Sequence, residues 1–326
     1  MFSIRPKHFF IYTLLSTLAL ASLWSCRKDV EIFRAHPPTI DDVQQLSQQA
    51  HSTASKTVFS LNQVQADTML ATPGGVRIFL TDTENLFADA GGDPVPCSTC
   101  QTLRVEVTEA LDKSDIIAYA VPTTTIDGRL LESGGMVRIT ASCDGEALQL
   151  LPGRKMKIQI PAQQPEADMQ VFSGTFDDTD FLGWQNTDLP VFQAEWVVPG
   201  PGTTEFGYEL FSPYLDWINC DRFYHEQSSS FCVEMPASFN SGNTQAYIVF
   251  KNQRTVAVLQ HDPASRKFCV PDAPSGYQVR LVTLSKTADG QFWLGNYETE
   301  IGTDATVQIT PQQVSEQQML DFLKSL

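Results

Sequence analysis

The most distinctive run of chemistry-bearing residues in the chain is Trp-Ile-Asn-Cys-Asp-Arg-Phe, which begins at Trp217. Aromatic rings beside a few fixed polar groups commonly hold sugars and peptides. One interpretation places Trp217 and Phe223 on a stacking surface. Asp221 and Arg222 would then fix the polar groups of a ligand. The alternative buries Trp217 and Cys220 in the core and pairs Asp221 with Arg222 or a neighbour.

Established catalytic motifs are absent from the sequence: there is no Gly-x-Ser-x-Gly elbow, His-Glu-x-x-His, phosphate-binding glycine loop or EF-hand spacing. The nearest approach to a nucleophile turn is Glu132-Ser133-Gly134-Gly135, which we interpret as a tight turn between strands. A hydrolase is the less favoured alternative, since carboxylate pairs from distant strands leave no linear motif. It would require His225 and His261 to share a cleft with acids. We predict no catalytic residue and no enzymatic activity.

Metal ligands are poorly represented. Cys97-x-x-Cys100 resembles half of a zinc site, but a structural zinc needs four ligands and no second closely spaced pair is present. Asp177-Asp178-Thr179-Asp180 offers oxygens that suit Ca²⁺, although acidic residues are also common in turns. We predict no metal and no cofactor.

The first 26 residues have the order of a bacterial lipoprotein signal. Arg5 and Lys7 precede an apolar run that ends in Leu-Trp-Ser-Cys at Cys26, and the run is too short and wrongly flanked for a membrane span. In such signals the cysteine thiol is acylated and the chain is cut just before it. We therefore predict a signal peptide over residues 1–25 and lipidation of Cys26.

Six further cysteines remain, and an even number in an exported chain indicates disulfides. Three lie on each side of the expected domain boundary: Cys97, Cys100 and Cys143 before it, and Cys220, Cys232 and Cys269 after it. Full pairing needs one bridge between domains, and one free buried thiol in each domain is equally consistent. The connectivity is left open.

Hydrophobic patterning predicts an all-β protein. Period-two alternation marks strands near residues 57–61, 76–80, 103–108, 136–142 and 155–160, then near 193–198, 206–211, 230–235, 245–250, 255–260, 278–283, 291–296 and 306–310. Glycine- and proline-containing turns separate them at a spacing typical of β-sandwiches. We expect two sandwiches, immunoglobulin-like or jelly-roll-like. A capping box at Ser315–Gln318 predicts a short terminal helix that packs on the second sandwich.

Composition suggests the domain limits. Residues 26–56 are polar and read as a lipid-anchored tether, in which the spacing of Ile40, Val43 and Leu46 predicts one short helix. The first sandwich is expected over residues 57–162, a proline-containing linker over 163–169, and the second sandwich with its terminal helix over 170–326.

The net charge disfavours some classes of binding partner. The chain carries −16 at pH 7 and has no basic cluster, which disfavours nucleic acid and anionic membrane surfaces. The membrane contact we predict is therefore the lipid anchor alone.

Several runs resemble uncharacterised two-domain β-rich surface lipoproteins of Bacteroidota-type bacteria. They are Gly74-Gly75-Val76, the run from Phe87 to Val95, the run from Val105 to Ala110, Lys113 to Ile117, Gly128 to Met136, the run at Trp217 to Phe223 and Gly276 to Val279. The resemblance covers most of residues 57–326 and departs from the group at residues 78–82 and around Cys97. It implies a two-part β-rich exported protein and brings no catalytic residue.

These observations predict an outer-membrane lipoprotein of the bacterial cell envelope, facing the surface or the periplasm, that acts as a non-enzymatic binding or structural module. The alternative is a carbohydrate-binding surface lipoprotein, which would need exposed aromatic rings on one sandwich face. A glycan or a protein at the surface is the expected partner.

The anchor is directly testable. Cys26→Ser removes the acylated thiol, so we expect the variant to move from the membrane to the soluble fraction on cell fractionation. Retention of the variant in the membrane pellet through detergent-free washes would show that the lipoprotein interpretation is wrong.

Overall fold

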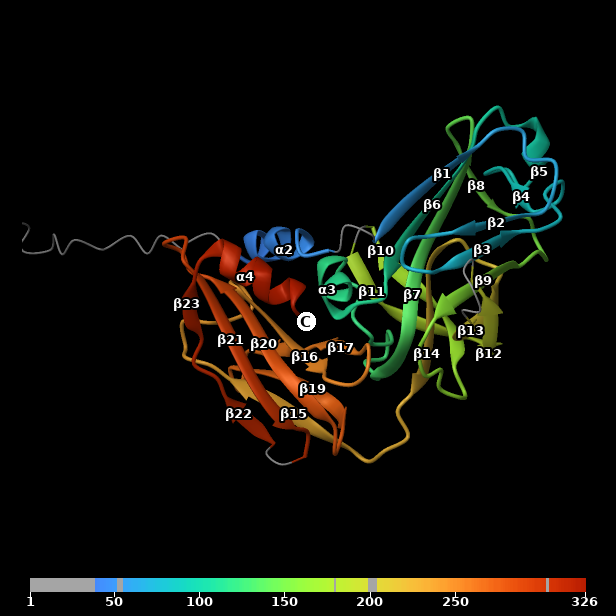
Figure 1. Ribbon diagram of the computed structural model, residues 1–326. Coiled ribbons are helices and arrows are strands. Elements are labelled where there is room, and N and C mark those ends of the chain that lie inside the picture. Colours follow the sequence, from blue (N-terminus) through green and yellow to red (C-terminus); the bar gives the residue numbers. More distant parts are fainter. Residues whose placement is uncertain (1–38, 52–54, 179, 199–203, 303–304) are drawn as a thin grey trace, which may run out of the picture. The chain divides into compact units, whose positions relative to one another are not determined.

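The computed structural model describes residues 39–51, 55–178, 180–198, 204–302 and 305–326. These form an all-β structure of two sandwiches with three short α-helices (Figure 1), as the sequence predicts. The signal peptide, Cys26 and the first part of the expected tether lie outside the described residues.

The first sandwich contains a nine-stranded and a five-stranded sheet. The nine-stranded sheet has the order β11-β10-β14-β7-β8-β4-β5, with β6 between β7 and β1. Its strands are β1 Lys56–Leu61, β4 Phe87–Ala88, β5 Pro94–Val95, β6 Leu103–Ala110, β7 Leu131–Cys143, β8 Glu146–Leu150, β10 Gln170–Asp177, β11 Asp180–Pro190 and β14 Asp216–Phe223. The five-stranded sheet, β12-β13-β9-β3-β2, consists of β2 Thr68–Ala71, β3 Arg77–Leu80, β9 Met156–Pro161, β12 Phe192–Val197 and β13 Thr204–Ser212.

The second sandwich pairs a four-stranded sheet, β18-β19-β15-β22, with a five-stranded sheet, β17-β16-β20-β21-β23. The four strands are β15 Ser228–Glu234, β18 Gln260–Asp262, β19 Lys267–Pro274 and β22 Thr306–Gln308. The five are β16 Thr244–Phe250, β17 Val256–Val258, β20 Gln278–Lys286, β21 Phe292–Glu300 and β23 Gln312–Val314. The helices are α2 Ile40–Gln48, α3 Lys113–Ala118 and α4 Glu316–Lys324, with a short 3₁₀ turn, η1, at Cys97–Thr99.

The sandwiches do not divide where the linker was expected. Strands β13 and β14 follow residues 163–169 in the chain, yet β13 pairs with β9 and β14 pairs with β7 of the first sandwich. The second sandwich therefore begins at β15. Composition pointed to the proline-containing segment, but strand pairing is a long-range property that composition does not carry.

The expected tether is partly wrong as well. The predicted helix forms as α2, Ile40–Gln48, but it lies against β16, β20 and α4 (Figure 1). Val43 is fully buried and Leu46 is 3% exposed. Burying two such aliphatic side chains contributes about 1.5–3 kcal/mol each, which a free tether would not gain.

The C-terminal helix confirms its sequence signal. Ser315 accepts a hydrogen bond from the Gln318 amide, and the Gln318 side chain accepts one from the Ser315 amide. The apolar face of α4 buries Met319, Leu320 and Leu323 in a cluster shared with β16 and β20 of the second sandwich.

The cysteines resolve the question that the sequence left open. Cys100 bonds to Cys143 and Cys232 bonds to Cys269, while Cys97 and Cys220 are free and buried. One free thiol thus lies on each side of the expected boundary. Burial raises the pKa of the Cys97 thiol to about 11, so it remains protonated at neutral pH.

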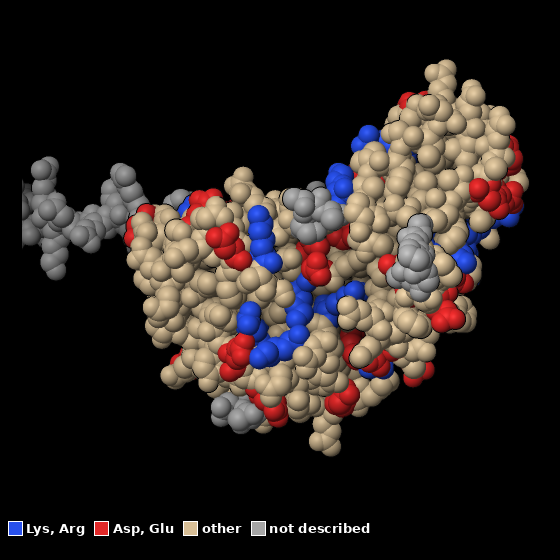
Figure 2. Space-filling model, viewed as in Figure 1, with Lys and Arg blue, Asp and Glu red and all other residues tan. Residues whose placement is uncertain are grey.

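In the described part of the chain, no helix is both long and apolar enough to cross a membrane. Figure 2 shows several Lys and Arg side chains gathered near the middle of this face, with Asp and Glu side chains beside them and toward its edges.

Candidate functional site

The four residues predicted as a ligand surface all lie on β14, but they do not form one surface. Trp217 is only 7% exposed and its ring lies 5.7 Å from that of Tyr119, while Asp221 is completely buried. Cys220 is also fully buried. This part of the strand therefore belongs to the core, and Trp217 offers no exposed ring on which a ligand could stack.

Arg222 and Phe223 lie nearer to solvent. Arg222 pairs with Glu132 at 2.8 Å and with Glu166 at 3.4 Å, not with Asp221. Consecutive strand residues point to opposite faces, which separates Asp221 from Arg222. The guanidinium of Arg129 covers the Phe223 ring at 3.6 Å from its centroid, so the ring is already stacked on a side chain of the protein.

The expected turn at Glu132–Gly135 is wrong, because these residues lie inside β7. Ser133 and Gly135 face Asp221 and Cys220 across the sheet, which leaves Gly134 as the extra residue of a β-bulge. A Cβ atom on Gly134 would lie 2.6 Å from the Tyr208 ring and 2.9 Å from the Cys220 carbonyl oxygen. The glycine pair that suggested a turn is required instead for this close approach.

The bulge is held by a buried polar cluster. The Asn219 amide donates to the Asp221 carboxyl at 2.6 Å, and the Gly135 amide donates to the Ser133 hydroxyl at 3.2 Å. Arg254, from the loop before β17, donates to the Gly134 carbonyl at 2.6 Å. Burial raises the pKa of Asp221 well above its usual range, although hydrogen bonds from Ser133 and Asn219 oppose the shift. The cluster therefore joins the two sandwiches around a carboxyl group whose burial favours the protonated form.

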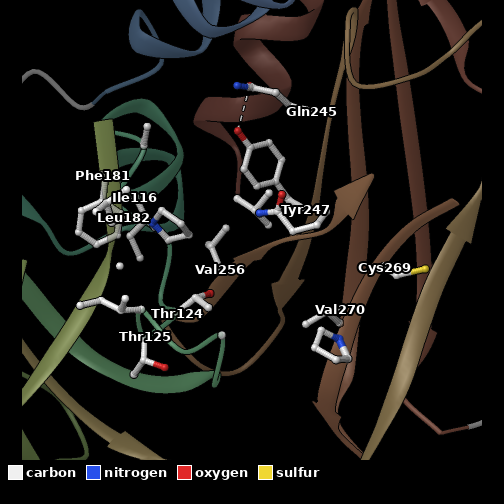
Figure 3. Close-up of a pocket in the computed structure, with 18 residues that line it drawn as sticks. Ile116, Thr124, Thr125, Phe181, Leu182, Gln245, Tyr247, Val256, Cys269 and Val270 are labelled. Atoms are coloured by element: carbon white, nitrogen blue, oxygen red, sulfur yellow. Dashed lines mark hydrogen bonds between the residues drawn. The ribbon is translucent and has the colours of Figure 1, made fainter. Parts of the chain in front are cut away.

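A second feature is an apolar pocket of about 360 Å³ between the sandwiches (Figure 3). One wall is formed by the end of α3, residues 120–128 and the β11 residues 181–183. The other is formed by β16, β17, β18 and β19. In Figure 3, Phe181, Leu182 and Ile116 lie on one side of Val256, with Val270 on the other. The volume is at the lower end of the range of small-ligand sites, about 300–1,000 Å³.

Hydrogen bonds hold the segment of residues 120–128, which forms part of the first wall of the pocket. The Thr123 amide donates to the Val256 carbonyl, and the Val256 amide donates to the Thr123 hydroxyl. The Trp184 amide donates to the Thr124 carbonyl, and the Trp184 carbonyl accepts from the Ile126 amide. Gly183 has a φ of +143°, and a Cβ atom there would lie 2.7 Å from the Ile126 nitrogen. Only glycine lets this segment lie so close to β11.

The pocket lining offers no group for acid–base or nucleophilic chemistry at neutral pH. Among the lining residues Tyr247 is the one that titrates, burial raises the pKa of its hydroxyl, and the hydroxyl donates to Gln245 at 2.9 Å. Cys269 is held in its disulfide. Thr124, Thr125, Gln245 and Gln260 add neutral polar groups, so the arrangement suits binding of an uncharged, largely apolar group.

The other sequence candidates are not brought together. In the part of the chain that the structure describes, no three His, Cys, Asp or Glu residues group as metal ligands. Asp177 pairs with Asp180 across the β10–β11 hairpin. His261 faces Phe268 on β19, whereas His225 precedes Ser228, which faces Pro274. Phe268 and Pro274 are six residues, or about 20 Å, apart along β19, so the segments that carry the two histidines approach opposite ends of that strand.

The pocket residues were missed at the sequence level. No strand was predicted over residues 170–190, although they form the β10–β11 hairpin. The pattern there is interrupted by a bulge that leaves Leu182 unpaired with β10. The sequence signal for the pocket was Phe181-Leu182-Gly183, in which two large apolar residues precede a glycine. In the structure, the Leu182 side chain is 51% exposed.

Comparisons with protein-family models, curated proteins and solved structures give no match. The resemblance to surface lipoproteins of Bacteroidota-type bacteria therefore stays a prediction.

The raised pKa of Asp221 has a consequence for stability. In the unfolded chain an aspartate ionises near pH 4, while the folded protein keeps the carboxyl protonated to higher pH. Ionisation of the carboxyl therefore stabilises the unfolded state as the pH rises. Above about pH 4, the free energy of unfolding falls by up to about 1.4 kcal/mol per pH unit. We expect Asp221→Asn to remove this loss.

Urea unfolding of both proteins between pH 4.5 and pH 7.5 measures the difference. The stability of Asp221→Asn relative to the wild type should increase with pH. A difference that stays constant over this interval would show that the Asp221 carboxyl is ionised in the folded protein. Asp177→Asn, on an exposed hairpin, serves as the control.

Proposed function

We propose that the protein is a lipid-anchored, exported binding module of the bacterial envelope that holds an uncharged, largely apolar ligand in the pocket between its sandwiches. The observation that carries the proposal is the lining of that pocket, which combines apolar side chains with neutral polar groups and has no charged residue among its described members. A site of this composition gains free energy from burying apolar surface and has no group to catalyse a reaction.

The disulfides support export. Cys100 is bonded to Cys143, and Cys232 is bonded to Cys269, the residue that faces it across the β15–β19 pair. Such bonds persist in oxidising compartments and are rare in the cytosol. They agree with the signal and the lipidated Cys26 expected from the sequence.

A charged side chain at the mouth of the pocket tests the proposal. Leu182→Asp adds a charge to a half-exposed wall residue, so we expect binding of the neutral dye N-phenyl-1-naphthylamine to weaken at least tenfold, as measured by its fluorescence. Val197→Asp, at a position 74% exposed and outside the pocket, is the matched control and should bind like the wild type. Equal loss in both variants, or none in Leu182→Asp, would contradict the assignment.

A glycan-binding role is the second candidate, because exposed aromatic rings do lie on one sandwich face. Phe192 is 51% and Phe211 is 37% exposed, and both lie on the outer face of the β12-β13-β9-β3-β2 sheet. Between them, Glu209 pairs with Lys157 at 2.8 Å and accepts from Gln159 at 2.9 Å. Rings flanked by such groups are typical of sugar-binding surfaces.

This candidate predicts a specific loss. If the outer face binds a glycan, a glycan array probed with residues 27–326 should give binders that Phe211→Ala weakens several-fold and Leu182→Asp leaves unchanged. An array without binders, or binders insensitive to Phe211→Ala, would remove the glycan-binding role.

A further inference from the structure

Strand β17 has one paired and one open edge. Leu259 donates to the Ala246 carbonyl, and Phe250 donates to the Thr255 carbonyl. Alternate residues of an antiparallel strand bond to the same side, so Thr255, Ala257 and Leu259 use their backbone groups on β16. The amides and carbonyls of Val256 and Val258 therefore point away from the sheet, toward the pocket.

The chain itself already occupies part of this edge. Val256 exchanges its outward hydrogen bonds with Thr123, and the same segment continues to Trp184 at the edge of β11. Residues 122–126 thus act as a short strand-like bridge between one edge from each sandwich. This contact shows that extended backbone fits between β17 and β11.

The edge continues beyond the bridge. Val258 is the next outward-facing residue, it lines the pocket, and within the described residues its amide and carbonyl have no backbone partner on that side. Opposite it, the bulge of β11 turns Leu182 into the pocket mouth. An unpaired strand edge next to an apolar pocket is the arrangement by which proteins add a peptide as an extra strand.

We propose that the occupant of the pocket is an extended, uncharged peptide segment of another protein, which pairs with Val258 and places an apolar side chain between Leu182 and Val256. This inference rests on the proposed function and names its ligand class. A lipid chain would fill the apolar space but leave the Val258 donor and acceptor unpaired. The strongly acidic chain and the uncharged lining both select against an acidic peptide.

The first experiment uses uncharged, end-blocked eight-residue peptides in which apolar and polar residues alternate. Binding is followed by anisotropy, and amide hydrogen exchange is read residue by residue by NMR. We expect bound peptide to slow exchange at Val258 at least tenfold and to leave Ala257 unchanged, since that amide is already bonded to β16. The same peptides with alternate backbone nitrogens methylated should bind at least tenfold more weakly.

A pair of variants separates backbone pairing from the apolar wall. Val258→Pro removes an outward-facing amide and is tolerated at such an edge position, so it should weaken peptide binding about fivefold more than it weakens binding of the naphthylamine dye. Val258→Ala keeps the amide and should weaken the peptide less than Val258→Pro does.

The outcomes distinguish the two proposals. If the dye binds but no alternating peptide does, the peptide assignment is overturned and the apolar pocket stands. If neither binds, both fail. If Val258 becomes protected with protein concentration alone and the protein dimerises on gel filtration, a second copy occupies the edge and the assignment to another protein is overturned.

Discussion

The constraint on which the structure depends is that the β17-β16-β20-β21-β23 sheet is apolar on both faces. Strand β16 is buried at nearly every position, and β20 is buried over most of its length. One face packs on the four-stranded sheet of its own sandwich, with Ile248, Phe250 and Leu281 in that core. The other face, which carries Tyr247, Val249 and Val282, would remain in water unless other elements covered it.

That cover comes from distant parts of the chain. Helices α2 and α4 lie on the sheet near the two ends of the described chain, and α3, β11 and β14 complete the cluster through Ile116, Trp184 and Trp217. The two sandwiches therefore share an apolar cluster. Asp221 is buried for the same reason, because the contact between the sandwiches covers the face of β14 that would otherwise be exposed to solvent.

Local signals in the sequence were enough for strands such as β6 and β16 and for the capped terminal helix, because alternation and the Ser315–Gln318 pair are features of adjacent residues. They were insufficient where pairing or burial is long-range. The sequence favours a core position for Trp217 over a stacking platform, but it does not show that the partner of the ring is Tyr119. Gly134 suggests a turn in the sequence, and only the pairing of β7 with β14 shows that it lies beside Cys220. The hairpin of β10 and β11 was missed because its bulge interrupts the alternation at Leu182.

The pocket lies where the segments between the two sandwiches do not fill the space. The bridge of residues 122–126 satisfies the outward groups of Val256 and Trp184, but its hydrogen bonds to β17 do not extend to Val258. Gly183 lets the bridge lie tight against β11, which leaves the opening on the side of Val258 and Val270. An alanine at Gly183 would push the bridge away from β11 and into this opening. The geometry that holds the two edges together at Val256 is therefore the same geometry that leaves the edge at Val258 open.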